Sequence, residues 1–323
     1  MEKTISQISR MMAPVLNDAQ LSELNDVLYA CLCGKGRHLE RGKNAKEHLR
    51  DFLAAKKLEG CSDRSIRYYA GVLGRFITEV NKSINEVSTD DVRGYLAEYP
   101  QFNGAGKVTV DNIRRVILSF FSWLESEDFI YKSPVRRIKK IRTSKVIKPV
   151  YSDEALEALR DVCSETRDLA IVDFLASTGI RVGELVKLDR QDIDFETREC
   201  VVHGKGDKER IAYFDARAKT HLQTYLNDRD DDNKALFVSL SRPYRRLEIS
   251  GVESRLRKLG EEAGLENVHP HKFRRTLATR AIDKGMPIEQ VQVLFGHSKI
   301  DTTLCYAMVD QDNVKRSHHK YIS

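Results

Sequence analysis

The chain has 323 residues, of which 41% are hydrophobic and 32% are charged, and its formal net charge is +6. This balance excludes a disordered chain, and the length is sufficient for two domains with separate cores. No run approaches the roughly 18 apolar residues of a membrane span, and the first residues lack a signal peptide's apolar segment. A cytoplasmic protein with no membrane association is therefore expected. Six scattered cysteines without a CxxC pair predict neither a metal site nor a disulfide framework.

Residues 1–42 are predicted to form an N-terminal helical extension. Apolar residues recur at helical spacing over 5–12 and again over 21–32, and the pattern stops at Gly34 and Gly36. The segment is too short to form a core alone. It would dock on the next domain, dock on a neighbouring subunit, or fray, and the sequence leaves these three possibilities open.

Residues 43–131 have the pattern of an all-α domain. Helices are predicted over 45–57, after a cap at Ser62, after a cap at Ser88 or Thr89, and over 113–124. Each carries one apolar stripe, so the four helices would pack as a small bundle.

A basic segment, residues 132–149, follows the predicted bundle and contains no acidic residue. Pro134 and Pro149 disfavour regular helix through it, so it is predicted to be an extended interdomain linker. Such a segment could lie along DNA phosphates, or it could simply be solvated. The candidate DNA contacts within it are Arg136, Arg137, Lys139, Lys140 and Arg142.

Residues 150–310 have a mixed pattern that predicts an α+β domain, with residues 311–323 as a tail. An apolar helix over 169–177 stops at Gly179, and strands are predicted over 200–203 and 210–214 on either side of a glycine-rich turn. A third strand is predicted over 235–240. Helices then follow over 252–264, 271–284 and 287–295.

A dispersed set of cationic and imidazole side chains marks this second domain. If these side chains converge on one point in the fold, they would bind a phosphodiester through two arginines, a lysine and two histidines. A tyrosine beside them would be a nucleophile. The residues are Arg181, Lys205, His271, Arg274 and His297, with Tyr306 as the tyrosine.

Four segments carry a family resemblance. STGIRVGEL, GKGDKER, HPHKFRRTLATRAIDKG and VLFGHSKIDTTLCY resemble, in order and spacing, the conserved boxes of the tyrosine recombinases of the phage-integrase and Xer type. The resemblance covers roughly residues 43–310. It implies a four-helix, SAM-like core-binding domain and a mixed α+β catalytic domain that form a C-shaped clamp around duplex DNA.

The resemblance also implies a role for each residue of the set. Arg181 and Arg274 would bind oxygens of the scissile phosphate, and His297 would hydrogen-bond it. Lys205 would protonate the leaving 5′ oxygen, although Lys208 on the same turn is an alternative to Lys205. His271 would assist proton transfer or hold the phosphate. The nucleophile would be Tyr306, which forms a 3′-phosphotyrosine, and Glu184 would brace Arg181.

A phosphotyrosine conserves the energy of the broken bond, so the resemblance implies strand exchange without ATP, metal or any other cofactor. The sequence departs from the family's pattern at Arg275, a position where many relatives carry a second histidine. We expect Arg275 to add to DNA backbone contact, and Arg255 and Arg257 to meet DNA as well. A solvated charged face explains Arg255 and Arg257 equally well.

The expected partner is double-stranded DNA with inverted-repeat core sites, bound by a homotetramer on two duplexes that exchanges strands through a Holliday junction. The free protein would be a monomer or weak dimer associated with the nucleoid, and an accessory directionality factor is possible. The tail 311–323 would pack into a neighbouring subunit, or fray. The extension before the bundle favours integration or excision of a mobile element, or DNA inversion. Xer-type chromosome dimer resolution, a type IB topoisomerase-like enzyme and an inactive DNA-binding protein are the alternatives.

Overall fold

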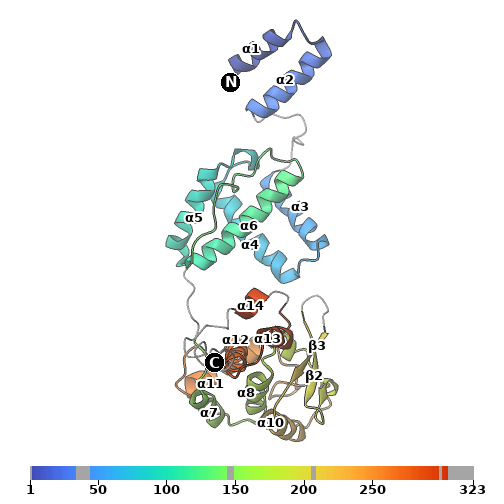
Figure 1. The fold of residues 1–323 in the computed structure, drawn as a ribbon, viewed down its shortest axis with the longest axis vertical. Helices are drawn as coiled ribbons and strands as arrows, with labels where there is room; N and C mark the ends of the chain where they lie inside the picture. The colour runs from blue at the N-terminus through green and yellow to red at the C-terminus, as the bar shows by residue number, and fades with distance from the viewer. Residues whose placement is uncertain (1, 34–43, 144–148, 205–208, 298–299, 305–323) are drawn as a thin grey trace, which may run out of the picture. The chain divides into compact units, whose positions relative to one another are not determined.

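The computed structural model describes residues 2–33, 44–143, 149–204, 209–297 and 300–304. The chain divides into two compact units, Met1–Val146 and Ile147–Ser323 (Figure 1). The division falls inside the predicted linker 132–149. Within the described residues, no helix is long and apolar enough to cross a membrane.

Unit 1 begins with two helices, α1 (Glu2–Met12) and α2 (Asp18–Cys33), that pack against each other as a hairpin (Figure 1). Ile5 of α1 is almost fully buried. Both helices lie within residues 1–42, the segment that the sequence predicts to be a helical extension.

Four further helices of unit 1 form the predicted bundle: α3 (Ala45–Leu58), α4 (Asp63–Val80), α5 (Thr89–Asn103) and α6 (Lys107–Ser126), with a 3-10 turn at Ile84–Glu86. Side-chain caps set three of their starts. Ser62 accepts from the backbone N–H of Ser65, and Asn44 and Ser88 each form a capping box. The sequence left the cap of α5 open between Ser88 and Thr89, and the structure assigns it to Ser88.

Aromatic side chains dominate the core of this bundle. Phe52 meets Phe120 edge to face with ring centroids 5.3 Å apart, and Phe76 meets Phe121 in the same way at 6.0 Å. All four rings are at most 1% exposed. Such pairs add to the stabilisation from burial, so the bundle has a core of its own.

The first part of the predicted linker packs on this bundle. Val135 is fully buried, and Ile138 and Ile141 pack partly buried against the same core. The backbone N–H of Ile141 donates to the buried carboxylate of Asp111 at 3.0 Å. Apolar residues therefore face inward at every third position, and the basic residues between them are exposed.

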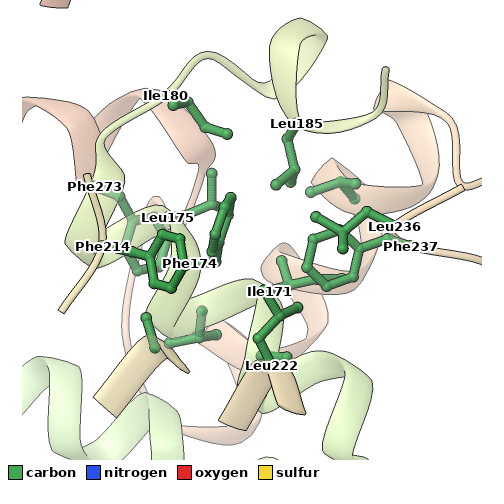
Figure 2. Close-up of a cluster of buried hydrophobic side chains, with 14 of the residues drawn as sticks. Ile171, Phe174, Leu175, Ile180, Leu185, Phe214, Leu222, Leu236, Phe237 and Phe273 are labelled. Atoms are coloured by element: carbon green, nitrogen blue, oxygen red, sulfur yellow. The ribbon is translucent and has the colours of Figure 1, made fainter. Parts of the chain in front are cut away.

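Unit 2 is built around α8 (Thr166–Thr178), a helix buried on most of its surface. It contacts α7 (Asp153–Asp161), α10 (Ala216–Asn227) and α12 (Pro270–Asp283). Figure 2 shows Phe174 and Leu175 of α8 among side chains from other elements, including Phe214 and Phe273. The remaining helices are α9 (Val182–Leu185), α11 (Ile249–Glu262), α13 (Ile288–Phe295) and α14 (Ile300–Leu304), with a 3-10 turn at Arg190–Asp192.

A small antiparallel sheet lies at one edge of unit 2, in the order β1 (Ile193–Asp194), β2 (Glu199–His203) and β3 (Glu209–Tyr213). Val202 pairs with Arg210 and Cys200 with Ala212, which confirms the predicted hairpin. The third strand predicted over 235–240 is wrong. That segment makes two isolated bridges, Ala235 with Asp189 and Val238 with Arg246, and two different partners cannot build one continuous ladder.

Candidate active site

The turn after α8 positions the first arginine of the predicted set. Gly179 ends the helix with φ of 58°, and a Cβ there would lie 2.6 Å from Cε1 of Phe295. Glycine is therefore required both for the left-handed backbone and for the close approach of α13. The chain then buries Ile180 and places Arg181 at the N-terminal end of α9.

Glu184 holds Arg181 through two hydrogen bonds. Its Oε1 accepts from Nη1 of Arg181 and its Oε2 accepts from the Arg181 backbone N–H, both at 2.8 Å. Oε2 also accepts from Nη2 of Arg210 at 2.7 Å. Glu184 is 4% exposed, whereas the Arg181 side chain is 44% exposed. Glu184 therefore contacts the arginine that the family resemblance implied it would brace, and that role stays a prediction.

Arg274 lies in the interior at 2% exposure. Its Nη1 donates to the carbonyl of Gly179 at 2.8 Å and its Nη2 to the carbonyl of Phe295 at 2.5 Å. The guanidinium also stacks on the Phe295 ring, 4.6 Å from its centroid. Arg274 therefore connects the end of α8, the start of α12 and the end of α13.

His297 follows Gly296 at the end of α13 and contacts Arg274. Nε2 of His297 accepts from Nη2 of Arg274 at 2.9 Å, so the ring proton lies on Nδ1, which donates to Oγ1 of Thr303 at 2.9 Å. Burial, then the charges of Arg274, Arg181 and Arg210, lower the pKa of His297 to about 4. The imidazole is therefore neutral here, and a hydrogen bond from Nε2 to a phosphate requires a change of partner.

An open cavity of about 960 Å³ brings together three of the residues predicted to be catalytic. Arg181, His271 and Arg274 all line it, and Arg257 of α11 lines it too. His271 is exposed, because Pro270 and the extended His269 start α12 at the cavity. A cavity lined by three arginines and a histidine is suited to a phosphate group.

Lys205, Lys208, Tyr306 and the tail 311–323 lie outside the described residues, so their predicted roles stay predictions. The described residues on either side of Lys205 and Lys208 are Gly204 and Glu209, and α14 ends two residues before Tyr306. Among the residues that are described, no three His, Cys, Asp or Glu side chains gather in a way that could hold a metal ion.

The predicted DNA contacts separate into three groups. Arg255 donates to the buried carboxylate of Asp168 at 2.5 Å, and Arg275 donates to the carbonyl of Pro149 at 2.8 Å, so both are held by internal partners. Arg257 is exposed at the cavity. The exposed residues of the basic segment in unit 1 are Arg136, Arg137, Lys139, Lys140 and Arg142.

Sequence reasoning assigned Arg210 only to a strand. In the structure its side chain is 12% exposed and contacts the carboxylate that braces Arg181. Burial lowers the pKa of Arg210 and the charge of Arg181 lowers it further, while Glu184 opposes both. The sequence did hold one signal of a buried position for Arg210. Arg210 lies two positions before the buried Ala212, so both side chains are on the inward face of the strand.

Comparison with known proteins agrees with this arrangement. Residues 146–313 match the phage integrase family, and residues 49–130 match the N-terminal SAM-like domain of phage integrases. Tyrosine recombinase XerC of Oceanobacillus iheyensis is 31% identical over 287 residues, covering 84% of this chain and 93% of that protein. XerC of Bacillus pumilus is 30% identical over 275 residues, covering 79% and 90%. The chain belongs to the phage integrase family of tyrosine recombinases and is a site-specific recombinase.

Solved structures share the fold. XerH site-specific recombinase, bound to a palindromic difH substrate, has a TM-score of 0.67 at 21% identity, covering 99% of this chain and 95% of that one. The Tn1549 transposon integrase, in complex with transposon right end DNA, has a TM-score of 0.66 at 18% identity, covering 85% and 99%. A helical domain followed by a mixed catalytic domain is therefore confirmed.

Proposed function

We propose that this recombinase cleaves DNA by attack of Tyr306 on a phosphodiester held by Arg181, Arg274 and His271. The observation that carries the proposal is the single cavity lined by these two arginines and this histidine. Their donors would stabilise the negative charge that develops on the non-bridging oxygens during transfer.

The proposed step balances without a cofactor. The hydroxyl oxygen of Tyr306 bonds to phosphorus, the bond from phosphorus to the 5′ oxygen breaks, and Lys205 gives that oxygen its proton. His271 assists removal of the tyrosine proton. The 3′-phosphotyrosine keeps the energy of the broken bond, so a 5′ hydroxyl from the partner duplex can reverse the step and exchange strands.

Duplex DNA with inverted-repeat core sites is the proposed partner, bound by both domains and assembled as a tetramer on two duplexes. The exposed basic segment of unit 1 supports this, because Val135 and Ile141 hold it against the bundle while its cations face solvent. Such an ordered row of cations loses less entropy on binding a phosphate backbone. The reaction would take place at the nucleoid in the cytoplasm.

The proposed use of the reaction is integration, excision or inversion of a DNA segment, with an accessory directionality factor that selects the direction. Chromosome dimer resolution is the second candidate, and the curated relatives named tyrosine recombinase XerC favour it. Cleavage mapping distinguishes the two, because the first predicts a site beside the gene and the second a site at a fixed chromosomal locus.

The test uses suicide duplexes, nicked near candidate sites, from DNA flanking the gene and from the chromosomal dimer-resolution region. Wild-type protein should form a covalent adduct without added metal, and Tyr306→Phe should bind the same DNA without forming it. Tyr213→Phe, at a tyrosine 52% exposed in unit 2, is the matched control and should react normally. An adduct formed equally well by Tyr306→Phe would refute the proposed nucleophile.

A further inference from the structure

Arg210 of β3 occupies a position that the proposed mechanism does not use. Its side chain is 12% exposed, and its Nη2 donates to Oε2 of Glu184 at 2.7 Å. Nε and Nη1 are also buried, and neither has a hydrogen-bond partner within the described part of the chain. Burying a guanidinium with so few contacts is unfavourable, which calls for a compensating role.

Two arginines share one carboxylate in this arrangement. Glu184 accepts from Arg181 on one side and from Arg210 on the other. With Arg181 alone, the buried carboxylate would neutralise the cation that faces the cavity. The second guanidinium leaves the three groups with a net formal charge of +1, and it contacts Glu184 from the side opposite Arg181, which fixes the orientation of the carboxylate.

Arg210 also contacts the turn that carries His297. A Cβ on Gly296 would lie 2.8 Å from Cδ of Arg210 and 2.9 Å from its Nε, so the arginine stem passes directly against this glycine. Gly296 has φ of 58° and ends α13 immediately before His297. One side chain therefore contacts the supports of two predicted active-site residues, which lie 116 residues apart in the sequence.

We infer that Arg210 is a positioning residue for strand cleavage, which acts through Glu184 to orient Arg181 and through Gly296 to place His297. This inference rests on the proposed function. It assigns Arg210 no contact with DNA and no part in proton transfer.

The test measures the single-turnover rate of covalent capture on the nicked duplex that carries the mapped cleavage site. At saturating DNA, Arg210→Met should slow capture about 10²-fold, the size expected when a reacting group is misplaced by about 1 Å. Arg210→Lys restores one charged hydrogen bond to Glu184 and should capture at an intermediate rate. It also serves as the second test variant if Arg210→Met does not fold.

Arg217→Met is the matched control, because Arg217 also pairs with a glutamate, Glu157, but on the surface of the same unit. It should capture at the wild-type rate. A double variant separates positioning from general stability: with Glu184→Gln present, Arg210→Met should cause a smaller loss than it causes in the wild-type background, because only the contact with Gly296 remains to be removed.

The inference would be overturned, and the proposed function left intact, if folded Arg210→Met captured DNA at the wild-type rate. If Arg210→Met does not fold, the same result with Arg210→Lys would overturn the inference. Fully multiplicative losses in the double variant would overturn it as well. Absence of capture by the wild-type protein on every duplex would instead remove the proposed function, and the inference with it.

Discussion

Gly296→Ala tests the contact between α13 and β3 directly. Gly296 has φ of 58°, a left-handed conformation that costs a residue with a Cβ roughly 1–2 kcal/mol. The new Cβ would also lie 2.8 Å from Cδ of Arg210, which is closer than real Cβ contacts allow. Arg210 must therefore move away from the turn.

Moving Arg210 disrupts its hydrogen bond to Glu184. Hydrogen bonds to charged groups contribute about 1.5–3 kcal/mol, so the two effects together should lower the free energy of unfolding by about 2.5–5 kcal/mol. Covalent capture of DNA should slow as well, because the same movement disturbs the supports of Arg181 and His297.

Gly264→Ala is the matched control for the backbone effect. Gly264 has φ of 66° and lies in the same unit, but nothing lies within 4 Å of a Cβ placed there. It should lose only about 1–2 kcal/mol. The difference between the two variants isolates the contact with Arg210.

Denaturant unfolding followed by far-ultraviolet circular dichroism measures both variants. The only tryptophan of the chain, Trp123, lies in unit 1, so its fluorescence reports that unit separately and should not change. Equal destabilisation by Gly296→Ala and Gly264→Ala, together with unchanged capture by Gly296→Ala, would refute the reasoning.

Three further predictions concern buried charges. The pKa of His297 is lowered to about 4 in the folded chain, so only the unfolded chain gains this proton as the pH falls from about 6.5 to 4. The contribution of His297 to the free energy of unfolding should therefore fall over that range by at most about 3 kcal/mol, and His297→Gln should abolish this contribution to the pH dependence. Asp111→Asn leaves the buried Arg114 without its anion and should destabilise unit 1 by about 3 kcal/mol, measured by Trp123 fluorescence; an unshifted midpoint would contradict this. Asp168→Asn, which removes the charge paired with Arg255, should destabilise unit 2 by about 3–5 kcal/mol in circular dichroism and leave the fluorescence transition in place.

Helix ends were predictable because they depend on neighbouring residues. Ser62 caps α4 through a donor three residues away, and Gly179 and Gly296 end their helices in the left-handed conformation that glycine permits. The hairpin β2–β3 was predictable for the same reason. The strand expected over 235–240 failed, because pairing with Asp189 and Arg246 depends on where distant segments lie.

The contacts of charged residues likewise could not be predicted where they depend on residues far away in the chain. Arg255 and Arg275 looked like candidates for DNA contact, but each finds an internal partner, Asp168 at 87 residues and Pro149 at 126 residues along the chain. The residue types in a charge pattern do not reveal such partners. Arg210 was overlooked for the converse reason, since its interest depends on Glu184, 26 residues earlier.

The sequence by itself determined the four-helix bundle, four helices of unit 2 (α8, α11, α12 and α13), the hairpin, the family and the residues expected to carry the chemistry, because these depend on local spacing and on short motifs. The tertiary structure decided which charges face the cavity and which are paired inside. It also decided that one carboxylate serves both Arg181 and Arg210. The physical reason is that burial and ion pairing depend on distances in space, and folding sets those distances between residues far apart in the chain.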